Sequence, residues 1–207
     1  MVNSRKDEEE VFARLKAHLF ERPNSAPLHY NLGLAYARKG ELDEAISEFK
    51  QALAINPGLI EGYINLGGIY FRKGNLEACI QQNKKALKLD PGFVQAFCNL
   101  GLAYFQQGNY EEAAAQYLRA IEVEPRFVQA RVNLANAYLQ QGNIEEAIEE
   151  NQKALEINPD FALAHNNLAL ALFRKADYSS AIIHCDKAAK LGFPVNPELL
   201  KKLDPYR

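Results

Sequence analysis

The chain has 207 residues, of which 48% are hydrophobic and 24% charged, and its formal net charge is −2. This balance provides no field of one sign, so neither nucleic acid nor an anionic membrane surface is expected as a partner. The sequence begins with MVNSRKDEEE, which no apolar stretch follows, and no run of about 18 apolar residues occurs. We therefore expect neither a signal peptide nor a transmembrane segment.

The cysteines are Cys79, Cys98 and Cys185, an odd number with wide spacings. This pattern argues against both a disulfide framework and a zinc site. We interpret the three side chains as small apolar fillers in a protein of the reducing cytoplasm.

The N-terminal segment, residues 1–25, contains the stretch EEVFARLKAHLF. Its spacing of apolar residues predicts an amphipathic helix over residues 8–20. Because Pro23 keeps the spacing of the prolines that follow, we interpret this helix as a half repeat that caps the next unit.

One pattern then recurs five times at intervals of 34 residues. NLGLAYARKG at residue 31 returns in variant form at residues 65, 99, 133 and 167. A proline marks the same interval, at Pro23, Pro57, Pro91, Pro125 and Pro159. The predicted repeats are 26–59, 60–93, 94–127, 128–161 and 162–195. Each contains two blocks with apolar residues at three- and four-residue steps, which predicts two amphipathic helices.

Turn and cap residues separate the two helices of each repeat. Glycines at equivalent positions should end the first helices in a left-handed conformation, namely Gly40, Gly74, Gly108 and Gly142. The predicted N-caps of the second helices are Asn75, Asn109, Asn143 and Asp177, with Glu112 and Glu146 forming capping boxes. Ala176 replaces the glycine in the last repeat. Residues 196–207, NPELLKKLDPYR, should form a short C-terminal cap with Leu199, Leu200 and Leu203 facing inward.

The repeated pattern resembles the tetratricopeptide repeat family over residues 26–195. The third repeat matches the family pattern throughout, with Phe97, Leu100, Gly101, Tyr104, Ala113, Tyr117, Ala120 and Pro125. Asn83 and Asn151 replace the second aromatic residue of the pattern in their repeats. The last repeat departs most, with Leu172 for tyrosine and Pro194 displaced by one residue.

The resemblance implies an all-α fold, a right-handed superhelical solenoid of antiparallel helix pairs. The N-terminal half repeat and a short C-terminal capping helix would complete it. Gly33, Gly67 and Gly101 would let the two helices of a repeat approach closely, whereas Gly68 would deepen the floor of a groove.

In this family the first helices line a concave face, and ligand contacts come mainly from a few first-helix positions. The corresponding groove residues are Tyr30, Leu34, Arg38, Ile64, Asn65, Gly68, Phe71, Arg72, Cys98, Asn99, Leu102, Phe105, Val132, Asn133, Asn136, Leu139, Asn167, Leu170, Phe173 and Arg174. They describe an apolar trough with amide groups and a few cations, although some of the apolar side chains and asparagines could instead pack between repeats.

No catalytic, metal or cofactor site is expected. His18, His29, His165 and His184 stand too far apart in the stack to converge, and no Walker loop, GxGxxG, CxxC or HExxH motif occurs. The best interpretation is a non-catalytic protein–protein interaction module that binds an apolar helix or extended peptide in its concave groove. One family subtype grips the C-terminal carboxylate of chaperones with lysine, arginine and asparagine, of which only the asparagine survives here, so that ligand is not expected.

A second interpretation is a self-assembling structural scaffold, that is, a homo-oligomer. In it the N-terminal helix leaves its own body and docks in the groove of a neighbouring copy, a head-to-tail contact that propagates.

Overall fold

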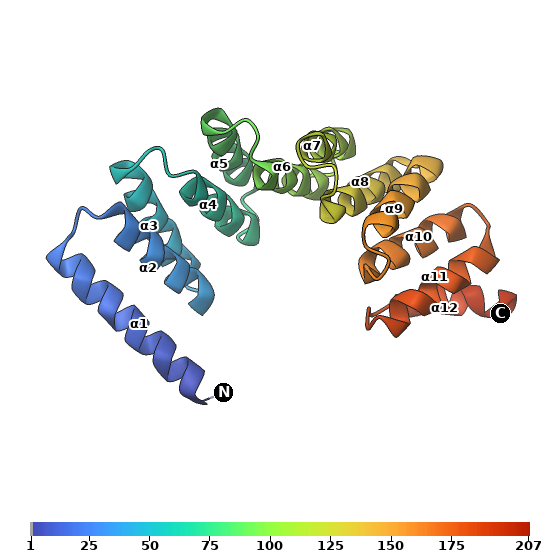
Figure 1. The fold of residues 1–207 in the computed structure, drawn as a ribbon, viewed down its shortest axis with the longest axis horizontal. Coiled ribbons are helices and arrows are strands. Elements are labelled where there is room, and N and C mark those ends of the chain that lie inside the picture. The colour runs from blue at the N-terminus through green and yellow to red at the C-terminus, as the bar shows by residue number, and fades with distance from the viewer. Residues whose placement is uncertain (1) are drawn as a thin grey trace. The chain divides into compact units, whose positions relative to one another are not determined.

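The computed structural model describes residues 2–207, with side chains described from Glu9 onward. Over these residues the secondary structure is helical and contains no strand, which confirms the all-α architecture of consecutive helix pairs (Figure 1). The chain divides into two units, residues 1–100 and 101–207. The boundary falls within helix α6 (Val94–Gln106), and each unit is described by itself.

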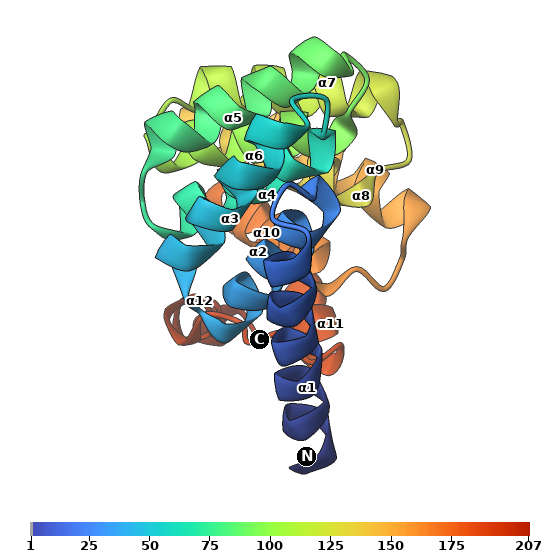
Figure 2. The ribbon, with the colours of Figure 1, turned by 90° about the vertical axis from the view of Figure 1, so that its left-hand side faces the viewer.

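The first unit contains one long helix and two helix pairs. In chain order its complete helices are α1 (Val2–Glu21), α2 (Ala26–Lys39), α3 (Leu42–Ile55), α4 (Ile60–Arg72) and α5 (Leu76–Leu89). Helix α1 is longer than the expected 8–20, and its N-terminal end extends past α2 in both views (Figures 1 and 2). Phe12 holds α1 against α2 through an edge-on contact with Tyr36, with ring centroids 5.0 Å apart.

The second unit continues the same alternation. Its complete helices are α7 (Tyr110–Val123), α8 (Val128–Gln141), α9 (Ile144–Ile157), α10 (Ala162–Arg174), α11 (Tyr178–Lys190) and α12 (Pro197–Leu203), followed by a 3-10 turn at Asp204–Tyr206. Leu199 and Leu203 of α12 are buried in the core of this unit, whereas Leu200 is partly exposed. The C-terminal segment therefore caps the last helix pair, as expected from its leucines.

The turns within the repeats have the expected left-handed backbone. Gly40, Gly74, Gly108 and Gly142 have φ between 74° and 86°. Ala176 adopts the same conformation, with φ 65°, and is the one non-glycine residue with positive φ among those described. A Cβ atom is unfavourable there because it crowds the following carbonyl oxygen.

The N-cap predictions were half right. The side chains of Asn75 and Asp177 accept hydrogen bonds from Ala78 N (3.1 Å) and Ser180 N (3.2 Å). Asn109 and Asn143 form no such cap.

The reason is a competing neighbour in each turn. The amide of Asn143 donates to Gln141 Oε1 at 2.9 Å, and Asn109 donates to Gln107 Oε1 at 3.4 Å. The backbone N–H of Asn109 and of Asn143 bonds to the preceding first helix, so the predicted capping boxes with Glu112 and Glu146 are also absent.

Glycine allows the two helices of a repeat to touch. A Cβ atom built on Gly33 would lie 2.9 Å from the ring of Phe49, and one on Gly101 would lie 2.5 Å from the ring of Tyr117. On Gly67 it would lie 2.6 Å from Asn83 Nδ2. Real Cβ contacts are not this short, so the predicted close approach at these glycines is confirmed.

Buried asparagines replace the aromatic side chain in two repeats. Asn83 and Asn151 are 0% and 1% exposed, and each donates to the carbonyl oxygen one turn earlier, of Cys79 (2.9 Å) and Ala147 (2.8 Å). Asn83 Oδ1 also accepts from Asn99 Nδ2 at 3.2 Å, but Asn151 Oδ1 has no partner. A buried acceptor without a partner costs about 1–3 kcal/mol.

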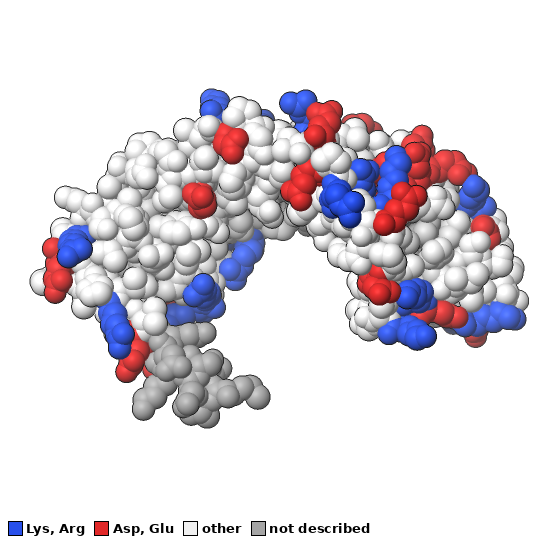
Figure 3. All heavy atoms as spheres, in the orientation of Figure 1, with Lys and Arg blue, Asp and Glu red and all other residues white. Residues whose placement is uncertain are grey.

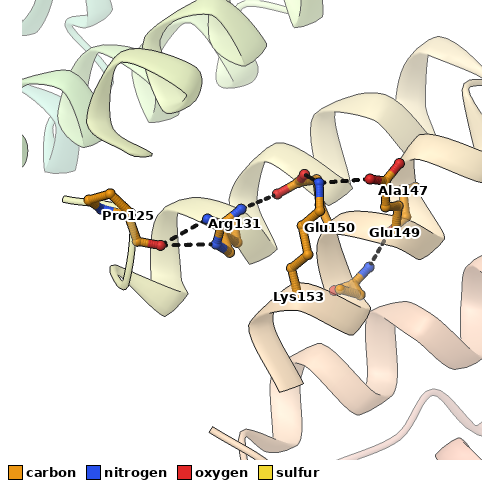
Figure 4. A network of polar contacts seen from close by, with 7 residues as sticks. Pro125, Arg131, Ala147, Glu149, Glu150 and Lys153 are labelled. Carbon is orange, nitrogen blue, oxygen red and sulfur yellow. Dashed lines mark hydrogen bonds and ion pairs between the residues drawn. The ribbon is translucent and has the colours of Figure 1, made fainter. Parts of the chain in front are cut away.

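Three repeats share a polar contact that joins the start of the first helix to the second helix. In the first repeat, His29 Nδ1 lies 2.6 Å from Glu48 Oε2, and its Nε2 donates to the carbonyl oxygen of Pro23 at 2.9 Å. In the fourth, Arg131 donates to Glu150 Oε2 at 2.8 Å and to the Pro125 carbonyl oxygen (Figure 4).

The fifth repeat has two histidines at these positions. His165 Nε2 donates to the carbonyl oxygen of Pro159 at 2.9 Å, and its Nδ1 lies 2.9 Å from His184 Nδ1. A carbonyl oxygen only accepts, so neutral His165 carries its proton on Nε2 and accepts at Nδ1 from His184 Nδ1–H. Two imidazolium rings cannot keep this bond, because both Nδ1 atoms would then be donors.

The three cysteines are free and buried, as the filler interpretation requires. Burial raises the pKa of the Cys79 thiol to about 11, and it also raises the pKa of Cys185. Both thiols are therefore protonated and unreactive at neutral pH. Among the described helices, none combines the length and apolar character that a membrane crossing requires.

Replacing Ala176 with glycine tests the left-handed turn. Ala176→Gly should stabilise the protein by about 0.5–1 kcal/mol, because it removes the Cβ crowding and loses only part of that gain to the greater freedom of the unfolded chain. The measurement is thermal unfolding followed by circular dichroism. Ala115, exposed in the middle of α7, is the matched control: Ala115→Gly should lower stability by about 1 kcal/mol. Equal effects of the two substitutions would contradict the assigned turn.

Acid should weaken the fifth repeat. Burial lowers the pKa of His184 below its ordinary value, and the neighbouring His165 adds to this shift. The unfolded chain therefore takes up a proton at higher pH than the folded chain. The stabilisation is complete above the unfolded pKa of about 6.5 and is lost as the pH falls through that value toward the lower folded pKa.

His184→Glu should reduce this loss, since it removes the buried imidazole whose pKa is lowered and recreates the His29–Glu48 contact, in which the partner of the histidine is a hydrogen-bond acceptor. Melting temperatures of both proteins at neutral pH and on the acid side of the unfolded pKa provide the comparison. His18→Glu, at an exposed position of α1, should retain the acid sensitivity of the original chain. The histidine pair has no such role if His184→Glu is equally acid-sensitive.

Candidate protein-interaction surface

The exposed face of the first helices in the first unit carries five of the predicted groove residues. We call Tyr30 and Leu34 of α2, with Ile64, Gly68 and Phe71 of α4, the N-terminal surface. All five are partly exposed. Within each helix they stand three or four residues apart, which places them on one side of it.

Direct hydrogen bonds join α2 to α4 and so hold this surface together. Asn65 Nδ2 donates to Tyr30 Oη at 2.9 Å and to the Glu61 carbonyl oxygen at 2.9 Å. Burial raises the pKa of Tyr30, the nearby Glu61 carboxylate raises it further, and the Asn65 bond opposes both. Tyr30 therefore remains a neutral phenol that accepts from Asn65. Beside it lies a cavity of about 140 Å³, also lined by Pro27, Asn31 and Leu59.

Gly68 is the one position of this surface where the helix has open space. A Cβ atom built there would meet nothing within 4 Å, in contrast to Gly33, Gly67 and Gly101. Packing therefore does not explain this glycine, although a helical glycine costs about 1 kcal/mol relative to alanine.

The second unit has an equivalent face, which we call the C-terminal surface. It comprises Leu102 and Phe105 of α6, Asn136 of α8, and Leu170 and Phe173 of α10. Leu102 is 38% exposed, and the other four are partly exposed. Phe105 and Phe173 also contact the second helices of their own repeats, with ring centroids 5.1 Å from Tyr110 and 5.6 Å from Tyr178. Part of the surface of each ring is therefore in contact with its own repeat and is not available to a ligand.

Three predicted groove residues are buried and are corrected here. Cys98, Val132 and Leu139 are 4%, 0% and 2% exposed. Val132 packs in a core cluster with Ala154 and Ala164, and Leu139 belongs to the cluster around Leu168. Both clusters include side chains of the following repeat. A ligand on the surface cannot reach Val132 or Leu139, because the next repeat covers them.

The asparagine positions have several structural roles. Asn65 and Asn99 bond to the preceding repeat, to Tyr30 and Asn83 respectively. Asn133 accepts from Gln129 at 2.9 Å, and Asn167 accepts from Asn166 at 3.3 Å, so these two amides are engaged within their own helices. The asparagines of the predicted groove thus form hydrogen bonds both within and between repeats.

Two of the three predicted groove arginines bind the protein backbone. Arg72 donates to the Ala37 carbonyl oxygen at 3.2 Å, and Arg174 donates to the Leu139 carbonyl oxygen at 2.7 Å. Each ties the end of its first helix to that of the repeat before. Arg38 is exposed, and no described residue forms an ion pair or hydrogen bond with its guanidinium group.

The charged side chains are distributed differently in the two units. In Figure 3, the viewed face of the first unit is largely uncharged, whereas acidic and basic side chains alternate over the second. Lys153 illustrates this, because it contacts both Glu149 (2.8 Å) and Glu150 (2.7 Å) and lowers the pKa of Glu149 (Figure 4). Among the described side chains, no three histidine, cysteine or carboxylate groups are placed to share a metal ion.

Sequence reasoning missed the polar pairs His29–Glu48, Arg131–Glu150 and His165–His184. The expectation that the histidines stand too far apart to converge is wrong for His165 and His184, which are in direct contact because they face each other across the two helices of one repeat. The signal was present, because the two members of each pair are 19 residues apart and the proline lies six residues before the first. Alignment of the repeats on their prolines would have shown it.

Family models match four segments of the chain. Two models described as tetratricopeptide repeat match residues 98–160 and 26–59, and a third matches residues 151–183. A model described as TPR repeat matches residues 67–108. A comparison with curated proteins gives no significant match.

Several solved structures are similar to the chain. MamA is 28% identical, and the match covers 80% of this chain and 91% of MamA with a TM-score of 0.71. YrrB, described as a TPR protein with an unusual peptide-binding site, is 20% identical over 92% of this chain and 97% of its own, with a TM-score of 0.71. PilF of Pseudomonas aeruginosa is 24% identical over 84% and 79% of the two chains, with a TM-score of 0.75.

The likeness to YrrB and PilF is one of fold. The family matches extend over residues 26–59 and 67–183, where the structure has the helix pairs and left-handed turns of the 34-residue pattern. The protein therefore belongs to the tetratricopeptide repeat family.

Proposed function

We propose that this protein is a non-catalytic cytoplasmic interaction module. It binds an apolar helix or extended peptide along the exposed face of its first helices, the groove that family geometry implies. The five predicted repeats supply this face, namely residues 26–59, 60–93, 94–127, 128–161 and 162–195. Cysteines that form no disulfide bond suit the cytoplasm, because disulfides are rare in that reducing compartment.

The open space at Gly68 is the observation that carries the proposal. Gly68 leaves a gap on α4 between Ile64 and Phe71, two partly exposed apolar side chains. A gap between apolar neighbours suits the side chain of a ligand. Apolar anchors in such positions often contribute about 2 kcal/mol or more to binding. Arg72 and Arg174 are already bonded to backbone carbonyl oxygens, so this face does not suit the C-terminal carboxylate of a chaperone.

Peptide selection on the immobilised protein tests this proposal. Selected peptides should carry apolar anchors at helical or alternating spacing. Phe71→Ala should weaken their binding by about 2 kcal/mol, as expected for loss of a central anchor. Gly68→Leu should also weaken it by filling the gap, and Gly68→Ala should raise the stability of α4 by about 1 kcal/mol. Isothermal titration and thermal unfolding supply the two readouts.

Leu118→Ala provides the control. Leu118 is 42% exposed on α7, a second helix, so its loss removes comparable apolar surface away from the proposed site. It should leave peptide binding unchanged. Peptides that bind Phe71→Ala and Gly68→Leu as tightly as the original protein would place the site elsewhere.

A second function, self-assembly, is favoured by two exposed apolar side chains of α1. Phe20 is 90% exposed and Val11 is 54% exposed. Burial of either side chain against a second copy would remove apolar surface from water, which favours association. In this alternative, α1 of one copy docks on the first-helix face of another.

Sedimentation velocity over a range of protein concentrations tests the alternative. The original chain should form larger species as its concentration rises, and Phe20→Glu should prevent this because a charge replaces the contact. Ile183→Glu, at a residue 66% exposed on α11, controls for the added charge. A chain that stays monomeric at every concentration excludes self-assembly.

A further inference from the structure

A pocket lies among the second helices of the first unit. It lies between the second helices α3 and α5, above α4, and has a volume of about 290 Å³. Leu53, Tyr63 and Leu66 supply apolar lining, and Lys50, Gln82 and Lys85 supply polar groups. None of the residues that line it is acidic.

The repeat that contains the pocket lacks the recurring polar pair. Tyr63 stands at the position of His29, Arg131 and His165, and Gln82 at that of their partners. A phenol in place of an imidazole or guanidinium removes the donor that reaches both the second helix and the proline carbonyl oxygen. No described residue hydrogen-bonds to the Gln82 side chain, which is nevertheless only 8% exposed.

Lys50 and Lys85 lie near aromatic rings at this pocket and are not paired with a carboxylate of the described residues. Lys85 Nζ lies 5.7 Å from the centre of the Tyr63 ring, and Lys50 Nζ lies 6.0 Å from that of Tyr70. Among the described side chains, no aspartate or glutamate pairs with either ammonium group. Two unpaired cations from separate helices therefore flank an apolar pocket that contains an unpartnered amide.

We propose that this pocket is a second binding site, which takes an acidic peptide segment with an apolar side chain beside its carboxylates. The carboxylates pair with Lys50 and Lys85 in charge-assisted hydrogen bonds. The apolar side chain contacts Leu53, Tyr63 and Leu66. The Gln82 amide, which both donates and accepts, bonds to the peptide backbone.

The probe is a fluorescein-labelled peptide that alternates aspartate with leucine and phenylalanine. A second peptide, with lysine in place of each aspartate, serves as the comparison. Fluorescence anisotropy should show saturable binding of the acidic peptide to the full chain and none of the basic one. Lys85→Glu should weaken binding about tenfold or more, the effect of losing a charge-assisted contact. Lys88→Glu makes the same charge change three residues further along α5, outside the pocket lining, and should weaken binding clearly less than Lys85→Glu because no direct contact is lost.

A double substitution tests the pocket without changing the lysines. Tyr63→His with Gln82→Glu recreates the His29–Glu48 pair, with Pro57 offering the carbonyl oxygen that Pro23 offers there. It should close the pocket and abolish binding while leaving the melting temperature unchanged or higher. If Lys85→Glu lowers the melting temperature, Lys85→Met, which keeps the apolar stem, takes its place.

Three results would overturn the proposal: no binding of the acidic peptide at concentrations up to about 1 mM, the limit of a weak specific contact; equal effects of Lys85→Glu and Lys88→Glu; or full binding by the double variant. Phe71→Ala should bind the acidic peptide normally. That result separates this site from the first-helix surface.

Discussion

The close approach of the two helices within each repeat is the constraint on which the rest of the structure depends. At Gly33 and Gly101 the first helix has no side chain, and the aromatic ring sixteen residues later lies where a Cβ would be. At the equivalent positions of α8 and α10 the residue is alanine, and its counterparts are Asn151 and Cys185, which are smaller than a ring. In the second repeat Gly67 faces Asn83, whose amide nitrogen would lie 2.6 Å from an added Cβ. Each repeat thus has a small residue on the first helix facing the side chain sixteen residues later on the second helix. Each pair is then equivalent enough to stack on the next.

Stacking explains which polar residues are structural. Arg72 and Arg174 are charged residues at the surface. Each donates a hydrogen bond to a backbone carbonyl oxygen near the end of the first helix of the preceding repeat. Unsatisfied carbonyl groups at helix ends need such partners. The second repeat lacks the polar pair of the first, fourth and fifth repeats, and a pocket lies beside its Tyr63 and Gln82. Variation on a fixed backbone therefore creates the two candidate binding features, an open glycine on one side and an unpaired amide on the other.

Much of this architecture was predictable from the sequence because spacing determines it. The interval of 34 residues predicted the helix pairs, and the glycines predicted the left-handed turns. Burial within the first-helix face was not predictable, because Val132 and Leu139 occupy the same positions in their repeat as exposed residues in others. Which neighbour covers them depends on the packing of the following repeat. Asn109 and Asn143 do not cap their helices, because the side-chain amide of each donates to a glutamine two residues earlier. A prediction from the identity of the cap residue alone does not take this neighbouring glutamine into account.

A double-mutant cycle at Gly33 and Phe49 tests the central constraint most directly. Gly33→Ala alone should destabilise the protein by about 1–3 kcal/mol through overpacking, and Phe49→Cys alone by about 3–5 kcal/mol through the cavity it leaves. The double variant, which matches the native pairing of Ala169 with Cys185, should be more stable than the sum of the two losses predicts by about 1 kcal/mol or more. Chemical denaturation of the four proteins measures this difference. Losses that add within about 0.5 kcal/mol would contradict the claim that these side chains together set the helix spacing.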